Sequence, residues 1–189
     1  MKRTILLTAF LVTGIFCFNA LAGVLEISPS EAIVIEPPEN NNDDYLGPRL
    51  LLSFALPDSI SDKDIAHAEI KAEGDFPAYD GMDIVTLDYY PVTTEWNSEA
   101  TWAYPWAEDG GDFNDDIGGF FTVEVGDDRL TMIDVTTTVR AWNDSSLTNR
   151  GIIVIPRKFN QEAYTSFSQG SSILSNIKLR IKQFKGFGQ

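Results

Sequence analysis

The chain consists of short runs of β-forming residues separated by glycine, proline, asparagine and aspartate, and no long window shows a helical period. This spacing of short runs and turn residues is typical of a β-sandwich or barrel. The run over residues 49–56, RLLLSFAL, is almost wholly apolar, which predicts a strand buried on both faces. The run over residues 176–182, NIKLRIK, alternates between apolar and cationic residues, which predicts a strand with one face in solvent. We therefore expect an all-β, antiparallel fold.

The pattern predicts about nine or ten strands and one or two short helical turns. The clearest strand-like runs cover residues 32–35, 49–56, 65–73, 82–89, 119–125, 130–135, 151–155, 164–168 and 176–182. The alanines between 65 and 73 leave a helix open there as an alternative to a strand. Residues 136–143 are expected to be helical, because Val135, Val139 and Trp142 recur at helical spacing and Thr136 is a suitable N-cap.

Residues 1–22 predict a secretory signal peptide. Two basic residues precede an apolar run over residues 5–18, and a small-x-small pattern ends at Ala22. A membrane anchor is the alternative, but the run is shorter than the ~20 apolar residues that a spanning helix needs. We expect cleavage after Ala22, a secreted or cell-surface protein with no membrane span after that cleavage, and a single β-sandwich domain over residues 23–189.

Composition argues against several classes of function. The chain has 28 acidic and 14 basic residues and a net charge of −14, whereas a protein that binds nucleic acid needs a basic surface. The only cysteine, Cys17, lies in the predicted signal, and His67 is the only histidine, so the usual zinc sites cannot be built. No nucleophile elbow of the Gly-x-Ser-x-Gly type is present. We expect a protein that is not an enzyme, with a glycosidase-like pair of carboxylates as the weaker alternative.

A long aromatic loop is expected between residues 103 and 118. At about 16 residues it exceeds the usual connection, and loops of this length tend to be functional or disordered. Tyr104, Trp106 and Phe113 are candidates for stacking on sugar rings, with neighbouring carboxylates and amides accepting hydroxyl protons. The alternative is that Trp106 and Phe113 fold back and cap one end of the sandwich. The other tryptophans are expected in the core: Trp96, Trp102 and Trp142.

The same loop is rich in oxygen ligands. They are Asp109, Asp112, Asn114, Asp115 and Asp116. Calcium prefers hard oxygen ligands, and the adjacent glycines permit tight wrapping, although the spacing is not that of an EF-hand. The sequence therefore predicts a candidate structural calcium site, with a solvated acidic surface as the alternative. No other cofactor is expected.

Four sequence blocks occur in the order RLLLSFALPDSI, VTTEWNSEATW, YPWAEDGGDFND and IDVTTTVRAWNDSSLTNRGIIVI. Together they resemble DNRLRE-type domains, and the likeness spans most of the chain between residues 49 and 181. This resemblance implies a jelly-roll β-sandwich of the kind found in secreted or cell-surface modules, often attached to enzymes that act on polysaccharides. Related domains are carbohydrate-binding modules, some with affinity for alginate.

Two functions follow as expectations. The first is a secreted, non-catalytic module that binds a polysaccharide or cell-surface component by aromatic stacking near Trp106. The second is a structural or adhesive extracellular protein, such as a component of a surface layer, matrix or appendage, without a small ligand. Neither expectation includes nucleic acid as a partner.

Overall fold

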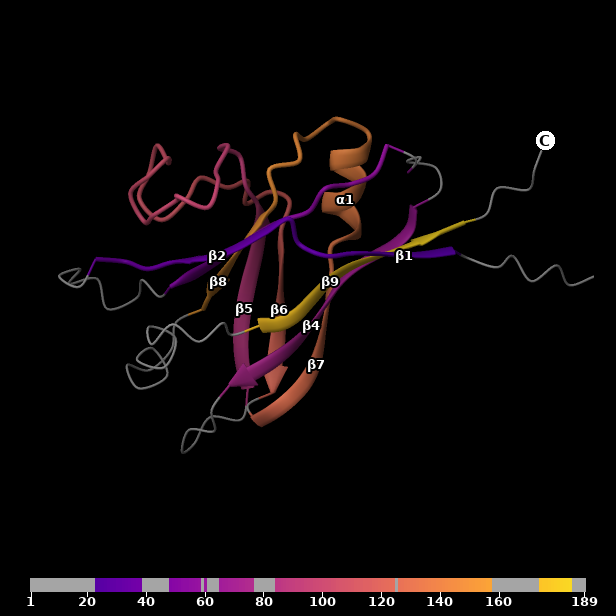
Figure 1. Ribbon diagram of the computed structural model, residues 1–189, viewed down its shortest axis with the longest axis horizontal. Coiled ribbons are helices and arrows are strands. Elements are labelled where there is room, and N and C mark those ends of the chain that lie inside the picture. The colour runs from indigo at the N-terminus through magenta and orange to yellow at the C-terminus, as the bar shows by residue number, and fades with distance from the viewer. Residues whose placement is uncertain are drawn as a thin grey trace, which may run out of the picture.

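The computed structural model describes residues 23–38, 48–58, 60, 65–76, 84–124, 126–157 and 174–184 (Figure 1). The predicted signal peptide and the strand expected at 164–168 lie outside these residues. The elements are β1 (Gly23–Ile27), β2 (Glu31–Ile35), β3 (Arg49–Ser53), β4 (Ile65–Phe76), β5 (Ile84–Pro91), β6 (Gly119–Glu124), β7 (Gly126–Asp134), α1 (Thr136–Asn143), β8 (Ile152–Pro156) and β9 (Leu174–Gln183).

The strands form two antiparallel sheets. Sheet A has the order β1-β9-β4-β7, and sheet B has the order β2-β3-β8-β5-β6. From β3 onward the chain passes repeatedly between the sheets, and β9 returns to lie beside β1, which is the winding of a jelly roll. The expected all-β, antiparallel sandwich with one or two short helical turns is confirmed, and α1 is the one α-helix among the described residues.

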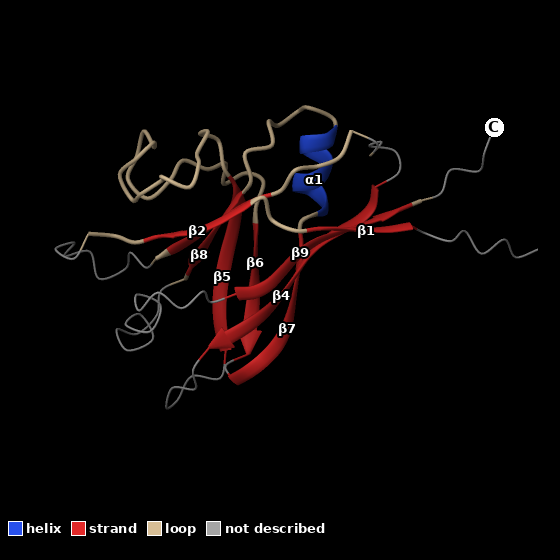
Figure 2. Cartoon of the chain, viewed as in Figure 1, coloured by secondary structure: helices blue, strands red, loops and turns tan. Residues whose placement is uncertain are grey.

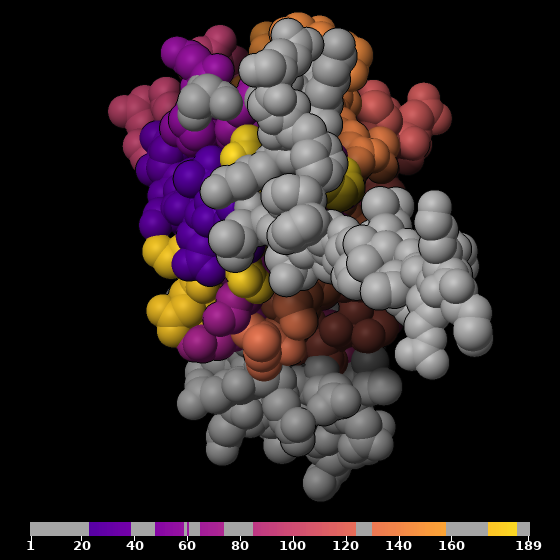
Figure 3. Space-filling model, turned by 90° about the vertical axis from the view of Figure 1, so that its right-hand side faces the viewer, coloured from indigo at the N-terminus to yellow at the C-terminus, as the bar shows by residue number. Residues whose placement is uncertain are grey.

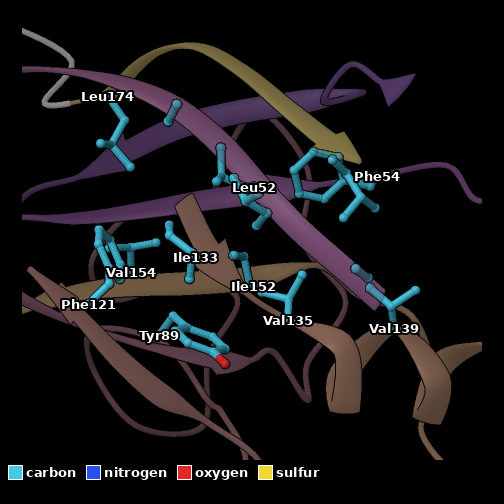
Figure 4. Packing of buried hydrophobic residues seen from close by; sticks show 14 of the residues in the cluster. Leu52, Phe54, Tyr89, Phe121, Ile133, Val135, Val139, Ile152, Val154 and Leu174 are labelled. Carbon is cyan, nitrogen blue, oxygen red and sulfur yellow. The ribbon is translucent and has the colours of Figure 1, made fainter. Parts of the chain in front are cut away.

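The main core lies between the two sheets. Alternate residues of each strand point inward, as the period of two in a strand requires. Figure 4 shows several of these side chains packed together, including Leu52, Tyr89 and Ile133. The Tyr89 hydroxyl donates a hydrogen bond to the carbonyl of Asp134, so this buried polar group is satisfied.

The alternation patterns identify how each strand is buried. In β3, Leu50 and Leu52 face the core between the sheets, while Leu51 is equally buried on the other side of sheet B. The prediction that this strand is buried on both faces is confirmed. In β4, the inward residues Ala68 and Ile70 alternate with polar ones, which settles the open choice at 65–73 in favour of a strand.

The helix α1 occupies the expected residues and lies at the same end of the sandwich as the long loop (Figure 2). Its N-cap is Val135 and has no side-chain cap bond, so the predicted capping role of Thr136 is wrong. Thr136 instead uses its hydroxyl to accept the N–H of Ala68, and its own N–H donates to the Asp134 carboxylate at 2.9 Å. The first bond ties β4 to the start of the helix, and the second ties the end of β7 to it.

Two further observations complete the fold. β1 was not among the expected strands, because its five residues give only a short alternation. Gly151 has φ +84°, and a Cβ at this position would overlap the carbonyl oxygen of Leu52, so only glycine fits. Within the described residues, no helix has the length and apolar character needed to cross a membrane.

Candidate functional site

The long loop folds onto the outer face of sheet B, the face turned away from sheet A. There it forms a second apolar cluster, distinct from the core between the sheets. The buried members of this cluster are Ile35, Leu51, Val92, Trp102, Trp106 and Ile153. The loop therefore forms a second layer over sheet B. This layer explains why β3 and β8 carry apolar residues on both faces.

Trp106 is part of this cluster rather than of the surface. Its exposed fraction is 8%, and its indole N–H donates to the carbonyl of Thr101 at 2.7 Å. This burial leaves little of the ring exposed for stacking on a sugar. Trp106 instead folds back onto the sandwich, as the alternative expected, although it covers the outer face of sheet B rather than one end. Trp102 and Trp142 are buried and Trp96 packs partly buried against the second cluster, which confirms their expected positions.

Arg49 anchors the loop from beneath. Its guanidinium lies 4.7 Å from the centre of the Trp102 ring, and Nη1 donates to the carbonyl of Gly110 at 2.6 Å. Burial lowers the pKa of Arg49, because it disfavours the charged form of the guanidinium. Gly110 has φ +90°, and a Cβ there would lie 2.9 Å from Trp102, so the loop passes closely over the cation and the ring.

Asp112 holds the loop in its turned shape. Its carboxylate accepts the hydroxyl of Thr94 at 2.6 Å and the N–H groups of Ala107 and Glu108 at 2.9 and 3.0 Å. Burial by itself raises the pKa of Asp112, but the hydrogen bonds from Ala107, Thr94 and Glu108 outweigh it and lower the pKa. Its oxygens are thus occupied by the loop's own donors.

The other predicted calcium ligands are dispersed. Asp109, Asp115 and Asp116 are exposed, and the side-chain oxygen of Asn114 accepts the N–H of Asp116. Across the part of the chain that the structure describes, no three acidic, histidine or cysteine side chains converge into a possible metal site. Calcium binding remains a prediction from the sequence.

Tyr104 and Phe113 have different surroundings. Tyr104 is 61% exposed at the tip of the loop. Phe113 is half-buried and stacks on Tyr90 of β5, with ring centres 4.8 Å apart and planes 18° from parallel. This stack extends the loop towards β5 and β6, where the outer face of sheet B is no longer covered by tryptophans.

An exposed aromatic side chain stands beside this stack. Phe120 of β6 lies opposite Asp88 of β5 and is 62% exposed. Arg157 follows β8 and lies over the Phe120 ring, 4.5 Å from its centre. The same guanidinium binds both oxygens of Asp88, at 2.8 and 2.9 Å from Nε. We define the Phe120 patch as Asp88, Tyr90, Phe113, Phe120 and Arg157.

The charges of the Phe120 patch are fixed by its geometry. The hydrogen bond with Asp88 raises the pKa of Arg157, so the guanidinium keeps its positive charge. Burial and the nearby Asp88 carboxylate raise the pKa of Tyr90, which keeps its hydroxyl protonated as a hydrogen-bond donor. The patch therefore combines the exposed Phe120 ring with the Tyr90 hydroxyl as a donor and with the ion pair of Arg157 and Asp88.

Sequence reasoning missed most of this patch. The run GFFTVE contains the one available signal, because alternation turns only one of Phe120 and Phe121 into the core and leaves the other outside. Phe121 is buried and Phe120 is exposed. The pairing of Arg157 with Asp88 joins residues 69 positions apart, and no local pattern predicts it.

The outer face of sheet A holds a different cluster. Glu69 of β4 is buried, and its carboxylate lies 2.9 Å from Arg180 Nη1, 3.1 Å from His67 Nε2 and 3.6 Å from Lys182 Nζ. Burial raises the pKa of Glu69, but the His67 hydrogen bond and the Lys182 and Arg180 charges lower it by more. His67 is itself half-buried in this network.

No family model matches this chain, and no curated protein matches it. The likeness to DNRLRE-type domains therefore remains a prediction from the sequence blocks.

Proposed function

We propose that this protein is a secreted, non-catalytic module that binds carbohydrate at the Phe120 patch. The single observation that supports the proposal most is the exposed Phe120 ring beside the Arg157–Asp88 pair, on the part of sheet B that the loop leaves uncovered. A contiguous apolar patch rimmed by polar residues often marks an interaction site, and Phe120 lies on the same sheet face as the half-buried, stacked rings of Tyr90 and Phe113.

The chemistry of the patch suits a sugar. The C–H face of a pyranose ring packs on an aromatic ring, while its hydroxyl groups need both donors and acceptors at the edge. Phe120 supplies the ring, and Asp88, Arg157 and the Tyr90 hydroxyl supply acceptors and donors. All of them stand on strands or directly after one, and sites on strands hold their geometry better than sites on mobile loops.

The experiment is binding of the purified protein to a panel of neutral and acidic polysaccharides, in calcium and in chelator. We expect saturable binding to one class. Phe120→Ala should weaken it by about tenfold or more, since burial of a phenylalanine is worth about 1.5–3 kcal/mol. The matched control is Phe184→Ala, because Phe184 is 61% exposed but follows β9 of sheet A. Thermal unfolding checks that both variants remain folded.

The possible results separate cleanly. Binding that Phe120→Ala weakens and Phe184→Ala preserves supports the proposal. The absence of binding to every polysaccharide, or equal loss in both variants, contradicts it. Dependence of binding on calcium would bring the predicted acidic loop ligands into the account, although the proposal does not require calcium.

A further inference from the structure

The two sides of the sandwich end differently. On one side, sheets A and B end at β7 and β6, which follow each other in the chain and contact each other. On the other side they end at β1 and β2. Among the described strands, β1 pairs only with β9 and β2 pairs only with β3, so each presents a second hydrogen-bonding edge. Residues 23–38, in indigo, form part of the molecular surface in Figure 3.

β2 lacks the features that usually protect an edge strand. Proteins shield such edges with lysine, proline, bulges or very short strands, because unpaired N–H and C=O groups are templates for another strand. The five residues of β2, EAIVI, contain no lysine, arginine, proline or glycine, and they pair with β3 in continuous register. Its only charge, Glu31, stands at its first position.

Both faces of β2 are apolar and incompletely covered. Ile33 packs against the second cluster on the outer side of sheet B, and Val34 packs against the core between the sheets. Both remain half-buried, and Ala32 is exposed. A further strand placed beside β2 would cover these side chains on both faces at once and extend the two apolar clusters.

A second copy of β2 fits this edge. In an antiparallel pair centred on Ile33, that residue meets Ile33 of the second copy, Ala32 meets Val34, and Glu31 meets Ile35, so no charged residue faces another. The two Glu31 residues then lie four residues apart along the pair, at roughly 13 Å for a rise of ~3.4 Å per residue. That exceeds the ~10 Å screening length at 0.1 M salt.

Antiparallel pairing with a second copy fits β1 less well. An antiparallel β1 pair centred on Leu25 brings the two Glu26 residues within two positions, or roughly 7 Å, of each other. Glu26 also forms an ion pair with Arg180 at 3.0 Å, which a second copy would crowd. β2 is therefore the edge that self-pairing favours.

We infer that β2 is a dimerisation edge through which two copies of this chain join their five-stranded sheets into one continuous antiparallel sheet. The partner is a second copy because the side chains and charges of the edge match those of the same edge when it is turned antiparallel. β6 ends sheet B on the side opposite to β2, so a dimer carries its two Phe120 patches far apart. That last consequence rests on the proposed function, and it would let one dimer bind a long glycan at two points.

The test is sedimentation velocity of the purified protein over a range of concentrations, for the wild type, Ala32→Lys and Val24→Lys. Each variant adds the same charge to an exposed position on an edge strand, in β2 and β1 respectively. We expect a concentration-dependent dimer for the wild type and for Val24→Lys. Ala32→Lys should dissociate at least tenfold more readily, because it places two lysines close together across the new strand pair. Higher salt should strengthen the dimer, since the net charge is −14.

Hydrogen exchange of the wild-type β2 amides gives a second readout that requires no variant to fold. The inference predicts slower exchange of these amides as the concentration rises, with no such change in β1. A wild type that stays monomeric with concentration-independent β2 exchange overturns the inference. A dimer lost in Val24→Lys but kept in Ala32→Lys overturns it as well. Neither result bears on glycan binding by the monomer, so the two proposals fail separately.

Discussion

The outer faces of the two sheets contrast sharply. The outer face of sheet B is apolar and lies beneath a loop that carries two buried tryptophans, Trp102 and Trp106. The outer face of sheet A is charged, with a row in register from Glu26 through Arg180 and Glu69 to Asp134. Two sheets of one sandwich are thus completed in opposite ways, one by a second hydrophobic layer and one by ion pairs.

This difference shows how the strands encode their surroundings. A strand under a second layer is apolar on both faces over most of its length, as in β3 between Arg49 and Ser53 and in β8. A strand with one face in solvent alternates, as in β9. The loop covers sheet B only in part. The uncovered remainder on β5 and β6 is where Phe120 is exposed, so the boundary of the second layer also sets the position of the proposed binding patch.

The largest expected effect is loss of the second layer. Trp102→Ala removes a 5%-exposed ring that packs against Arg49, and it should lower the free energy of unfolding by about 3–5 kcal/mol. Met132→Ala on the outer face of sheet A is the comparison, and it should change the same quantity by less than about 0.5 kcal/mol, since Met132 is exposed. Denaturant unfolding measures both, and similar losses in the two variants would erase the contrast between the faces.

The next effect concerns the ion pairs of sheet A. Glu69→Ala leaves Arg180 without its buried partner and should cost about 1–3 kcal/mol of unfolding free energy. Glu26→Ala removes the other partner of Arg180, but the Glu26 side chain is 55% exposed against 8% for Glu69, so its expected cost is below about 1 kcal/mol. Equal losses of unfolding free energy in the two variants would mean that burial does not determine how much each ion pair with Arg180 contributes.

A smaller effect is expected for the polar tie within the loop. Asp112→Asn should lower the free energy of unfolding by about 1–2 kcal/mol at neutral pH, because one acceptor oxygen becomes a donor facing N–H or hydroxyl groups. Asp109→Asn alters an exposed residue of the same loop and should change the free energy of unfolding by less than about 0.5 kcal/mol.

The same residue has a pH signature. The pKa of Asp112 is lower in the folded state than in the unfolded state, so its contribution is complete above the unfolded value of about 4 and is lost as the pH falls through the folded pKa. Asp112→Asn should therefore flatten the decline of stability below about pH 4. If stability fell as steeply below about pH 4 in Asp112→Asn as in the wild type, Asp112 would not be responsible for that loss.

The smallest effect is expected at the loop tip. Tyr104→Ala removes a 61%-exposed ring and should change stability by less than about 0.5 kcal/mol. Thermal unfolding checks this value. A large loss would show that the tip takes part in the second layer. If Tyr104→Ala instead weakened glycan binding as much as Phe120→Ala, the binding surface would include the loop tip that the sequence predicted.

The sequence predicted those features that depend on local pattern. Alternation and apolar runs identified β3, β8 and β9, and helical spacing identified α1. It could not tell which side of the sandwich the aromatic loop covers, because burial of Trp106 depends on the distant residues Leu51 and Ile153. The Phe120 patch depends on strand register and on Arg157 meeting Asp88, and both arise only from long-range pairing.

The most direct test of the account is to map binding on the protein itself. Isotope-labelled protein is titrated with the polysaccharide that binds in the panel, and amide chemical shifts are followed by NMR. The account predicts shift changes concentrated around Asp88, Phe120 and Arg157, with the outer face of sheet A unaffected. Changes centred on β4 and β9 instead would place the ligand on the charged face and contradict carbohydrate binding at the Phe120 patch.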